Sequence, residues 1–449
     1  MGRTATGIEG VLWGMACMTL AACAPGDGSA PWPDGCPGAG PRETPTAVGL
    51  PWEVVSGGSR GVSAYDARPS VNPAVDQQED GLPVFHLFVP DSLPDDDDEH
   101  PARLYHLGRC YALSLKAHGS TSMAFPKRSY TLEFEGDSFD AARHKVTLIS
   151  PFNDNSYLRT RLSFMLWNLL SPEHAQVQAS SAVVYVNGRY EGLYTVVDHV
   201  DRHLLAQQGW DAEGELFKAV DWNANFSRLD ESGRSKHSLN QGFEKKDGEP
   251  KKGDAAFAHI EALTAFVADA SPEDFVAHRE EWLVSRDYED WWILGTLIQA
   301  RDSVAKNAYH FRDSGPEGKW RFVPWDMDAS FGQEWDTRRV DAEAWDDFSG
   351  PNQLFARMLA APDIAAPLRA RYRALLHGSL RVENVLGLVD IAASELAEAA
   401  RKDEGKWGVA YATFPRWSDR TDIVGHDDEV RALREWVRQH WERVDQQLR

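Results

Sequence analysis

The sequence has few cysteines, fewer basic than acidic residues, and no long apolar run. Four cysteines stand among 449 residues, and none has the spacing to histidine that a zinc site needs. Lys and Arg number 47 against 69 Asp and Glu, which gives a formal charge of −22 at pH 7. Because DNA and RNA are bound through clustered basic residues, we expect no nucleic-acid partner. No stretch reaches the roughly 18 apolar residues of a membrane span, so we expect no transmembrane helix.

A shorter apolar stretch of ten residues lies near the N-terminus, at positions 11–20. This length suits the core of a signal peptide. The letters LAAC at 20–23 place small residues before a cysteine, which is the pattern of a bacterial lipoprotein cleavage site. We therefore expect residues 1–23 to form a signal peptide and a lipid on Cys23 to be the membrane attachment of an exported cell-envelope protein, on its periplasmic or surface side. An ordinary secretory signal that is cut nearby is the alternative.

The chain divides by composition. Residues 24–80 are rich in Pro, Gly, Ala, Ser and Asp and are expected to form a disordered tether. We expect a folded core at 81–345 and a helical extension of the same domain at 346–449. Cys36 and Cys110 could form a disulfide in an exported protein, although sequence alone does not establish the pairing.

Apolar periodicity predicts the elements of the folded part. Alternation of apolar and polar residues predicts strands at 83–90, 111–119, 129–136 and 215–220. Helical periodicity predicts helices at 157–170, 201–209, 255–285, 287–301, 352–376, 382–403 and 427–448. The Asn187-Gly188 pair predicts a hairpin over 182–200, and the polar segment 227–254 is interpreted as a mobile insertion. Strands first and helices later predict an α+β fold, with the site in a cleft between two lobes.

The strongest candidate site is a set of carboxylates and one carboxamide. An apolar, helix-like run leads to Asp302, and Asn307 follows five residues later. Asp326 and Asp328 follow a second apolar run, just before a Phe-Gly turn. Hard oxygen ligands of this kind suit Mg²⁺ or Mn²⁺. Protein kinases place their catalytic base, metal-binding Asn and metal-binding Asp in the same order, which indicates metal-dependent phosphoryl transfer.

Simpler interpretations exist for each candidate. Polar residues at a helix end would account for Asp302 and Asn307, and a turn after a buried strand would account for the two later aspartates. The loop 119–128 carries Ser120 and Lys127, which could contact phosphates, but a solvated hairpin connection explains both equally well. Trp325 could wall the cleft or belong to the core.

Six segments together resemble the spore-coat protein H (CotH) kinase-like family. They are GSTSMAFPKRSYTLEF (119–134), NDNSYLRTRLSF (153–164), YVNGRYEGLYTVVDHVDRHLL (185–205), LFKA (216–219), RDSVAKNAYHFRD (301–313) and FVPWDMDASFG (322–332). The resemblance spans about residues 82–345, and more loosely the helical C-terminus. It implies an atypical protein-kinase-like fold with a strand-rich N-terminal lobe and a helical C-terminal lobe. It also implies ATP-dependent and Mg²⁺- or Mn²⁺-dependent phosphorylation of Ser or Thr on an exported protein.

The resemblance implies a role for each acidic candidate. Asp302 looks like the catalytic aspartate, which orients or deprotonates the substrate hydroxyl. Asn307 looks like its metal-binding partner. Asp326 looks like the aspartate that holds the metal on the nucleotide phosphates, and Asp328 would assist it.

Basic and hinge residues follow from the same resemblance. Lys127 is the candidate for contacting the α- and β-phosphates, and Lys218 is the alternative. Arg159 could support the phosphates or pair with Asp154. Asp198 stands where an acidic residue is expected after the second hairpin strand. The segment 196–199, between hairpin and helix, would be the hinge beside adenine.

Two features depart from the kinase pattern. Helix 157–170 has no Glu to face Lys127, so the usual Lys–Glu ion pair is not visible. Asp198 is shorter than the Glu that we would expect there. Both departures bear on the choice of lysine, and neither affects the metal-binding candidates.

The net charge and the export signal indicate what kind of protein the substrate would be. A Ser/Thr-rich, basic, exported protein is the expected substrate, because a −22 charge steers basic partners. Asp302 and Asp326 could instead be the carboxylate pair of a glycoside hydrolase. A surface protein that keeps a kinase-like fold only for binding is a further alternative, and transfer of AMP would use similar ligands.

Overall fold

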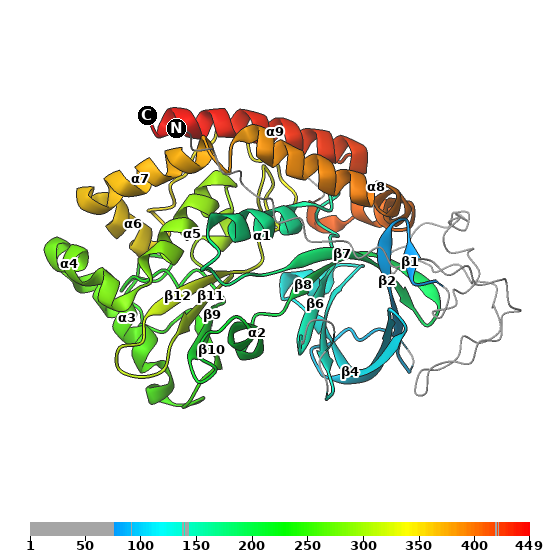
Figure 1. The fold of residues 1–449 in the computed structure, drawn as a ribbon, viewed down its shortest axis with the longest axis horizontal. Helices are drawn as coiled ribbons and strands as arrows, with labels where there is room; N and C mark the ends of the chain where they lie inside the picture. The colour runs from blue at the N-terminus through cyan, green and yellow to red at the C-terminus, as the bar shows by residue number, and fades with distance from the viewer. Residues whose placement is uncertain (1–75, 91, 137–138, 140–142, 418–419, 421) are drawn as a thin grey trace, which may run out of the picture.

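The computed structural model describes residues 76–449 except 91, 137–138, 140–142, 418–419 and 421. It is a mixed α and β structure whose strand-rich part precedes its helix-rich part (Figure 1). The predicted signal peptide, the lipid site Cys23, Cys36 and most of the tether lie outside the described residues. Within the described part, no helix is both long and apolar enough to cross a membrane.

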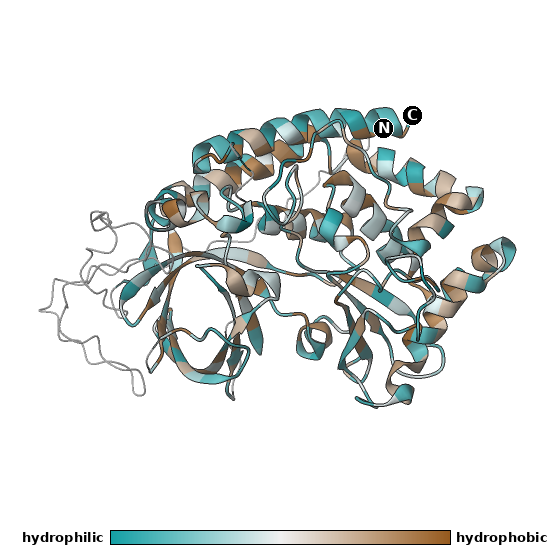
Figure 2. Ribbon diagram, turned by 180° about the vertical axis from the view of Figure 1, so that it is seen from behind, coloured by the Kyte–Doolittle hydropathy of each residue, from teal (hydrophilic) through white to brown (hydrophobic). Residues whose placement is uncertain are grey.

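The first sheet closes on itself. Its eight strands follow the order β1-β2-β3-β4-β5-β6-β8-β7, and β2 also pairs with β7. The strands are β1 (Gln78–Glu79), β2 (Leu82–Phe88), β3 (His100–His106), β4 (Arg109–His118), β5 (Ser129–Phe134), β6 (Lys145–Ile149), β7 (Ala179–Val186) and β8 (Arg189–Asp198). The closing pair is parallel, and its register joins Val84 to Val183. Figure 2 shows this sheet as a ring of strands in which hydrophobic and hydrophilic stretches alternate.

Alternation along the strands produces the enclosed core of this sheet. Burial in β4 alternates residue by residue, because successive side chains of a strand point to opposite faces. The inward set includes Leu104, Leu115, Leu132 and Leu148, all fully buried. The predicted hairpin between β7 and β8 is confirmed: Asn187 and Gly188 have φ of +48° and +79°, as a type I′ turn requires at both central positions.

A second sheet of four antiparallel strands has the order β10-β9-β11-β12. Its strands are β9 (Glu215–Ala219), β10 (Phe243–Asp247), β11 (Ala308–Arg312) and β12 (Trp320–Pro324). Strand β10 lies inside 227–254, so the prediction of a mobile insertion there was wrong. Phe243 packs into the main core, and Lys245 forms a buried ion pair with Glu215, 2.5 Å from Nζ to Oε1, so the inward face of this short strand is held.

The helices cover both sheets (Figure 1). They are α1 (Arg159–Leu170), α2 (Arg202–Gln207), α3 (Ala258–Asp269), α4 (Pro272–Trp282), α5 (Ser285–Leu297), α6 (Gln353–Ala360), α7 (Pro362–Leu376), α8 (Val382–Ala412) and α9 (His426–Gln447). The helix predicted over 255–285 is divided, because Ser271 caps α4 with Pro272 as its first residue. Helix α8 packs against β8 and β2, and α9 packs against α5 and α7. The C-terminal helices therefore join the two parts of the molecule.

Candidate active site

Asp302 lies in a short turn that the surrounding core fixes. Helix α5 ends at Leu297, Gln299 takes a positive φ of +49°, and the 3₁₀ turn η4 (Arg301–Ser303) follows. The indole of buried Trp291 donates to the carbonyl of Ser303, at 3.0 Å. The amide of Asn352, from the start of α6, donates to the carbonyl of Val304, at 2.6 Å. These bonds from two helices hold the turn in one position.

Two neighbours engage the Asp302 carboxylate, one at each oxygen. The Asn307 amide donates to Oδ2 at 2.9 Å, so the structure brings these two predicted residues together. Lys306 pairs with Oδ1, also at 2.9 Å. The sequence prediction did not include Lys306, although its place four residues after Asp302 is the signal that could have identified it. Asn307 itself is fixed, because it has φ of +53° and its N–H donates to the carbonyl of Ala219 in β9.

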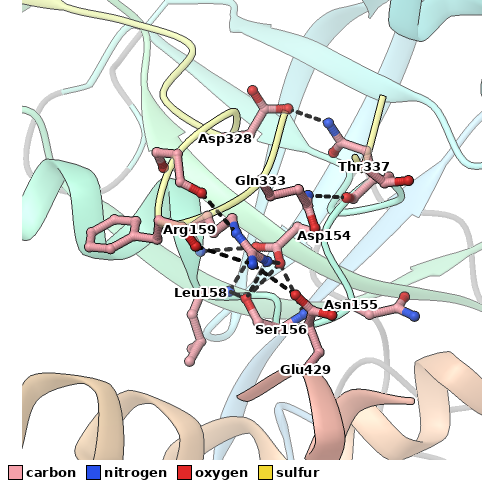
Figure 3. A network of polar contacts seen from close by, with 12 residues as sticks. Asp154, Asn155, Ser156, Leu158, Arg159, Asp328, Gln333, Thr337 and Glu429 are labelled. Carbon is pink, nitrogen blue, oxygen red and sulfur yellow. Dashed lines mark hydrogen bonds and ion pairs between the residues drawn. The ribbon is translucent and has the colours of Figure 1, made fainter. Parts of the chain in front are cut away.

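Asp326 and Asp328 lie in the turn that follows β12. Asp326 has φ of +55°, which is uncommon for a residue with a side chain. Its carbonyl accepts a hydrogen bond from the Ser303 hydroxyl, at 2.7 Å, so this turn is joined to the turn that carries Asp302. Asp328 Oδ2 accepts from the Asn153 amide at 2.6 Å (Figure 3). The three predicted aspartates therefore lie on two loops that contact each other.

Burial disfavours the ionised forms of these carboxylates. Burial raises the pKa of Asp302 and of Asp326 above the ordinary range, and Lys306 opposes the shift at both. Burial, and then the charge of Asp326, raises the pKa of Asp328 to about 8. A divalent cation beside these groups would favour their ionised forms.

The donor set fits a hard cation. In the described part of the chain, no three His, Cys, Asp or Glu side chains lie close enough to hold a metal by themselves. Mg²⁺, however, commonly takes one or two carboxylates and completes its shell with water and phosphate oxygens. Asp326, Asn307 and Asp328 offer oxygen ligands of that kind, and none of the three is a soft ligand.

Lys127 is buried in an ion pair, and its expected contact with a phosphate stays a prediction. Its side chain is 1% exposed, and its Nζ donates to the Leu193 carbonyl and to Asp403 Oδ1, each at 2.6 Å. The acidic partner comes from α8, whereas the kinase pattern would have placed it on α1. These two bonds use two of the three donors of the ammonium group.

Lys218 is the predicted lysine whose pKa is influenced by the charge of Asp326. It projects from β9, with Nζ 5.7 Å from the ring centre of Tyr309 and 6.0 Å from that of Trp325. Burial lowers its pKa, and the charge of Asp326 acts against that shift. Lys218, the alternative candidate for the phosphate contact, is therefore close enough to Asp326 to sense its charge.

Arg159 forms a buried ion-pair network, which Figure 3 shows with the guanidinium at its centre. One terminal nitrogen lies 2.5 Å from Asp154 and the other lies 2.7 Å from Glu429 of α9. Its Nε donates to the carbonyl of Ser330, at 3.0 Å. The pairing with Asp154 was one of the two expectations, and these partners engage the guanidinium that would otherwise meet a phosphate. The network instead supports the turn that carries Asp328.

The remaining predicted residues lie apart from this cluster. Ser120 is exposed and makes no capping bond to the 3₁₀ turn η2 (Thr121–Ala124) that follows it. Asp198 ends β8, where it accepts from Arg143 at 3.3 Å and from the N–H of Gln178 at 2.8 Å. The expected hinge at 196–199 continues β8 through Asp198, paired with β6.

Aromatic rings gather where the two sheets meet. His118 at the end of β4 and His199 just after β8 lie 6.0 and 6.2 Å from Trp325, measured between ring centres. Burial lowers the pKa of both histidines to about 3, so both imidazoles are neutral at physiological pH. Trp325 also contacts Phe164 and Tyr309, which makes it part of the core as well as part of this ring cluster.

Comparisons with known proteins identify the family of this chain. The model of the CotH kinase protein family matches residues 115–442, so the chain belongs to the CotH family. One curated relative is the inner spore coat protein H of Bacillus subtilis (strain 168). It is 29% identical over 317 residues, which cover 68% of this chain and 83% of the relative.

Proposed function

We propose that this protein is an atypical protein kinase that transfers the γ-phosphate of ATP to Ser or Thr of an exported protein. One observation carries the proposal: Asp302 contacts Asn307, and Ser303 links their turn to the turn of Asp326 and Asp328. A base, an amide and two carboxylates in kinase order thus meet on two adjoining loops. Membership of the CotH family supports the same reaction.

The proposed reaction is a displacement at the γ-phosphorus. The substrate hydroxyl oxygen forms a bond to that phosphorus, while the bond to the bridging oxygen breaks and ADP leaves with the electron pair. The proton of the hydroxyl passes to the carboxylate of Asp302, which also orients the hydroxyl. Mg²⁺ or Mn²⁺, when bound by Asp326 and Asn307 with help from Asp328, would supply positive charge beside the phosphate oxygens. The fixed loops would contribute by positioning the reacting groups.

A two-lobe arrangement would suit the nucleotide. The closed first sheet would serve as the N-terminal lobe, and the second sheet with helices α3 to α9 as the C-terminal lobe. Neutral His118 and His199 lie beside Trp325, the residue that precedes Asp326 in the chain. Together the three rings form a polar and aromatic cluster that would suit a purine base. Lys218 also lies near Trp325, with Nζ 6.0 Å from its ring centre, and would contact phosphate oxygens.

Export and substrate form the second part of the proposal. The LAAC pattern at 20–23 supports a lipid-anchored, exported protein, and a relative named as a spore coat protein supports a surface location. The charge of −22 favours a basic, Ser/Thr-rich acceptor.

The test is transfer of label from ATP to a basic, Ser-rich acceptor by the full chain with Mg²⁺ or Mn²⁺. We expect γ-label to be transferred by the wild type and by Asp363→Asn, an exposed control, and to be lost in Asp302→Asn and Asp326→Asn. Transfer of α-label instead would establish nucleotidyl transfer. Transfer of neither label, by folded protein and with several acceptors, would favour a binding protein or a sugar-active enzyme.

A further inference from the structure

Lys306, which was not among the expected site residues, forms an ion pair with Asp302, the proposed general base. Lys306 Nζ lies 2.9 Å from Asp302 Oδ1, and the two side chains are 22% and 17% exposed. Because the Asn307 amide already donates to Oδ2, both oxygens of this carboxylate are engaged. Lys306 therefore competes with a substrate hydroxyl for the Oδ1 atom of Asp302.

The Lys306 contact is the one that can break at low cost. Asn307 is held by a positive φ and by its N–H bond to β9, whereas Lys306 has a long, flexible stem that reaches solvent. Solvent reaches both side chains of this pair, which weakens the attraction between them. The fully buried pair of Lys127 and Asp403 offers no such freedom.

The charge of Lys306 also reaches the proposed metal ligand. Its positive charge opposes the raised pKa of Asp302 and of Asp326, so the ammonium group acts on both the proposed base and the proposed metal ligand. The Lys306 ammonium group lies over the ring of Trp222, in the loop after β9, with Nζ 5.6 Å from the ring centre. Trp222 is itself packed against the main core, so the platform under Lys306 is fixed.

We propose that Lys306 is a catalytic residue that exchanges partners. In the free protein it covers Asp302; when the nucleotide binds, its ammonium group moves to the γ-phosphoryl oxygens and exposes Asp302 to the hydroxyl. Lys306 then balances the charge that develops during transfer, and it exchanges no proton and no covalent bond. Trp222 acts through Lys306 as a positioning residue. This inference rests on the proposed function and adds to it the group that recognises the third phosphate.

Nucleotide binding separates this role from a structural one. With Mg²⁺ present, we would titrate ADP and the β,γ-imido analogue of ATP into the full chain and into Lys306→Met. The variant should bind the analogue roughly tenfold more weakly, because it loses a hydrogen bond to a charged group, and should bind ADP as the wild type does. Lys306→Arg should recover part of the difference, and Trp222→Leu should give an intermediate loss. Lys251→Met, on an exposed lysine, is the control.

Transfer of γ-label provides the second readout. Lys306→Met should slow a single turnover on the order of a hundredfold, with an unchanged thermal unfolding midpoint. Unchanged binding and unchanged turnover would overturn the inference and leave the proposed kinase function standing. Equal weakening of ADP and analogue would also overturn it, because Lys306 would then contact the shared phosphates. A wild type that binds neither nucleotide would overturn both proposals.

Discussion

Lys127 and Asp403 form an ion pair that is almost completely buried, with Nζ 2.6 Å from Oδ1 and side chains 1% and 2% exposed. The same carboxylate accepts from the N–H of Leu193 at 2.7 Å and from the hydroxyl of Tyr157 at 3.0 Å. One aspartate of α8 therefore holds the loop before β5, strand β8 and the segment before α1. The strand-rich part of the molecule is thus completed by a helix from near the end of the chain.

Removal of one partner should destabilise the protein strongly. Asp403→Ala leaves the Lys127 ammonium group buried without compensation, and we expect the free energy of unfolding to fall by about 3–5 kcal/mol. The double variant Lys127→Met with Asp403→Leu should recover most of the loss. Urea unfolding measures both. An Asp403→Ala protein as stable as the wild type would contradict a structural role for the pair.

The same double variant tests the function of Lys127. If Lys127 serves only in this ion pair, the folded double variant should transfer label within about threefold of the wild type, because it retains Lys218 and Lys306. The comparison is made at a temperature where both proteins are folded. Complete loss of transfer would return Lys127 to the catalytic group.

Lys218 should affect all nucleotides alike. We expect Lys218→Met to weaken binding of ADP and of the imido analogue of ATP by a similar factor, roughly tenfold, because it would contact phosphates that both share. Lys306→Met should discriminate between the two ligands. Titration of the two variants in parallel with Lys251→Met makes this comparison, and selective loss of the analogue by Lys218→Met would contradict the assignment.

Substitutions of Asp302 and of Asp326 should have different effects on metal binding and on phosphoryl transfer. Asp326→Asn removes a proposed metal ligand, so Mn²⁺ binding in the presence of ADP, followed by electron paramagnetic resonance, should weaken at least tenfold. Asp302→Asn should leave Mn²⁺ binding within about threefold and still abolish transfer, because Asp302 is assigned as the base. Equal loss of Mn²⁺ binding in both variants would show that Asp302 is also a ligand.

Stability in acid should depend on Glu429. Burial alone would raise its pKa, but the charges of Arg159 and Arg339 hold that pKa at about 2, below the ordinary value of 4.5. The ionised group therefore contributes stability above pH 4.5 that is lost as the pH falls towards 2. We expect the wild type to exceed Glu429→Gln in unfolding free energy by on the order of 3 kcal/mol at pH 6, with the difference shrinking below pH 4.5. A difference that stays constant from pH 6 to pH 3 would contradict this account.

Local patterns in the sequence predicted much of this structure. The Asn187-Gly188 turn, the strands near it and the order of Asp302, Asn307 and Asp326 all depend on neighbouring residues, and periodicity and turn chemistry report on neighbours. Local patterns do not predict contacts between residues that are far apart in the sequence. Asp403 and Glu429 lie far along the chain from the groups that they bind, so tertiary packing, and no local pattern, identifies them.

The parallel pairing of β2 with β7 explains why the closed sheet was not foreseen, and it also sets an order of assembly. Val84 cannot find its partner Val183 until the ribosome has made the intervening strands and α1. During synthesis, β2 must therefore wait with one edge unpaired, which is the kind of exposed strand that other chains can join. Closure then removes that edge, and the late, non-local step should govern how fast the domain reaches its native state.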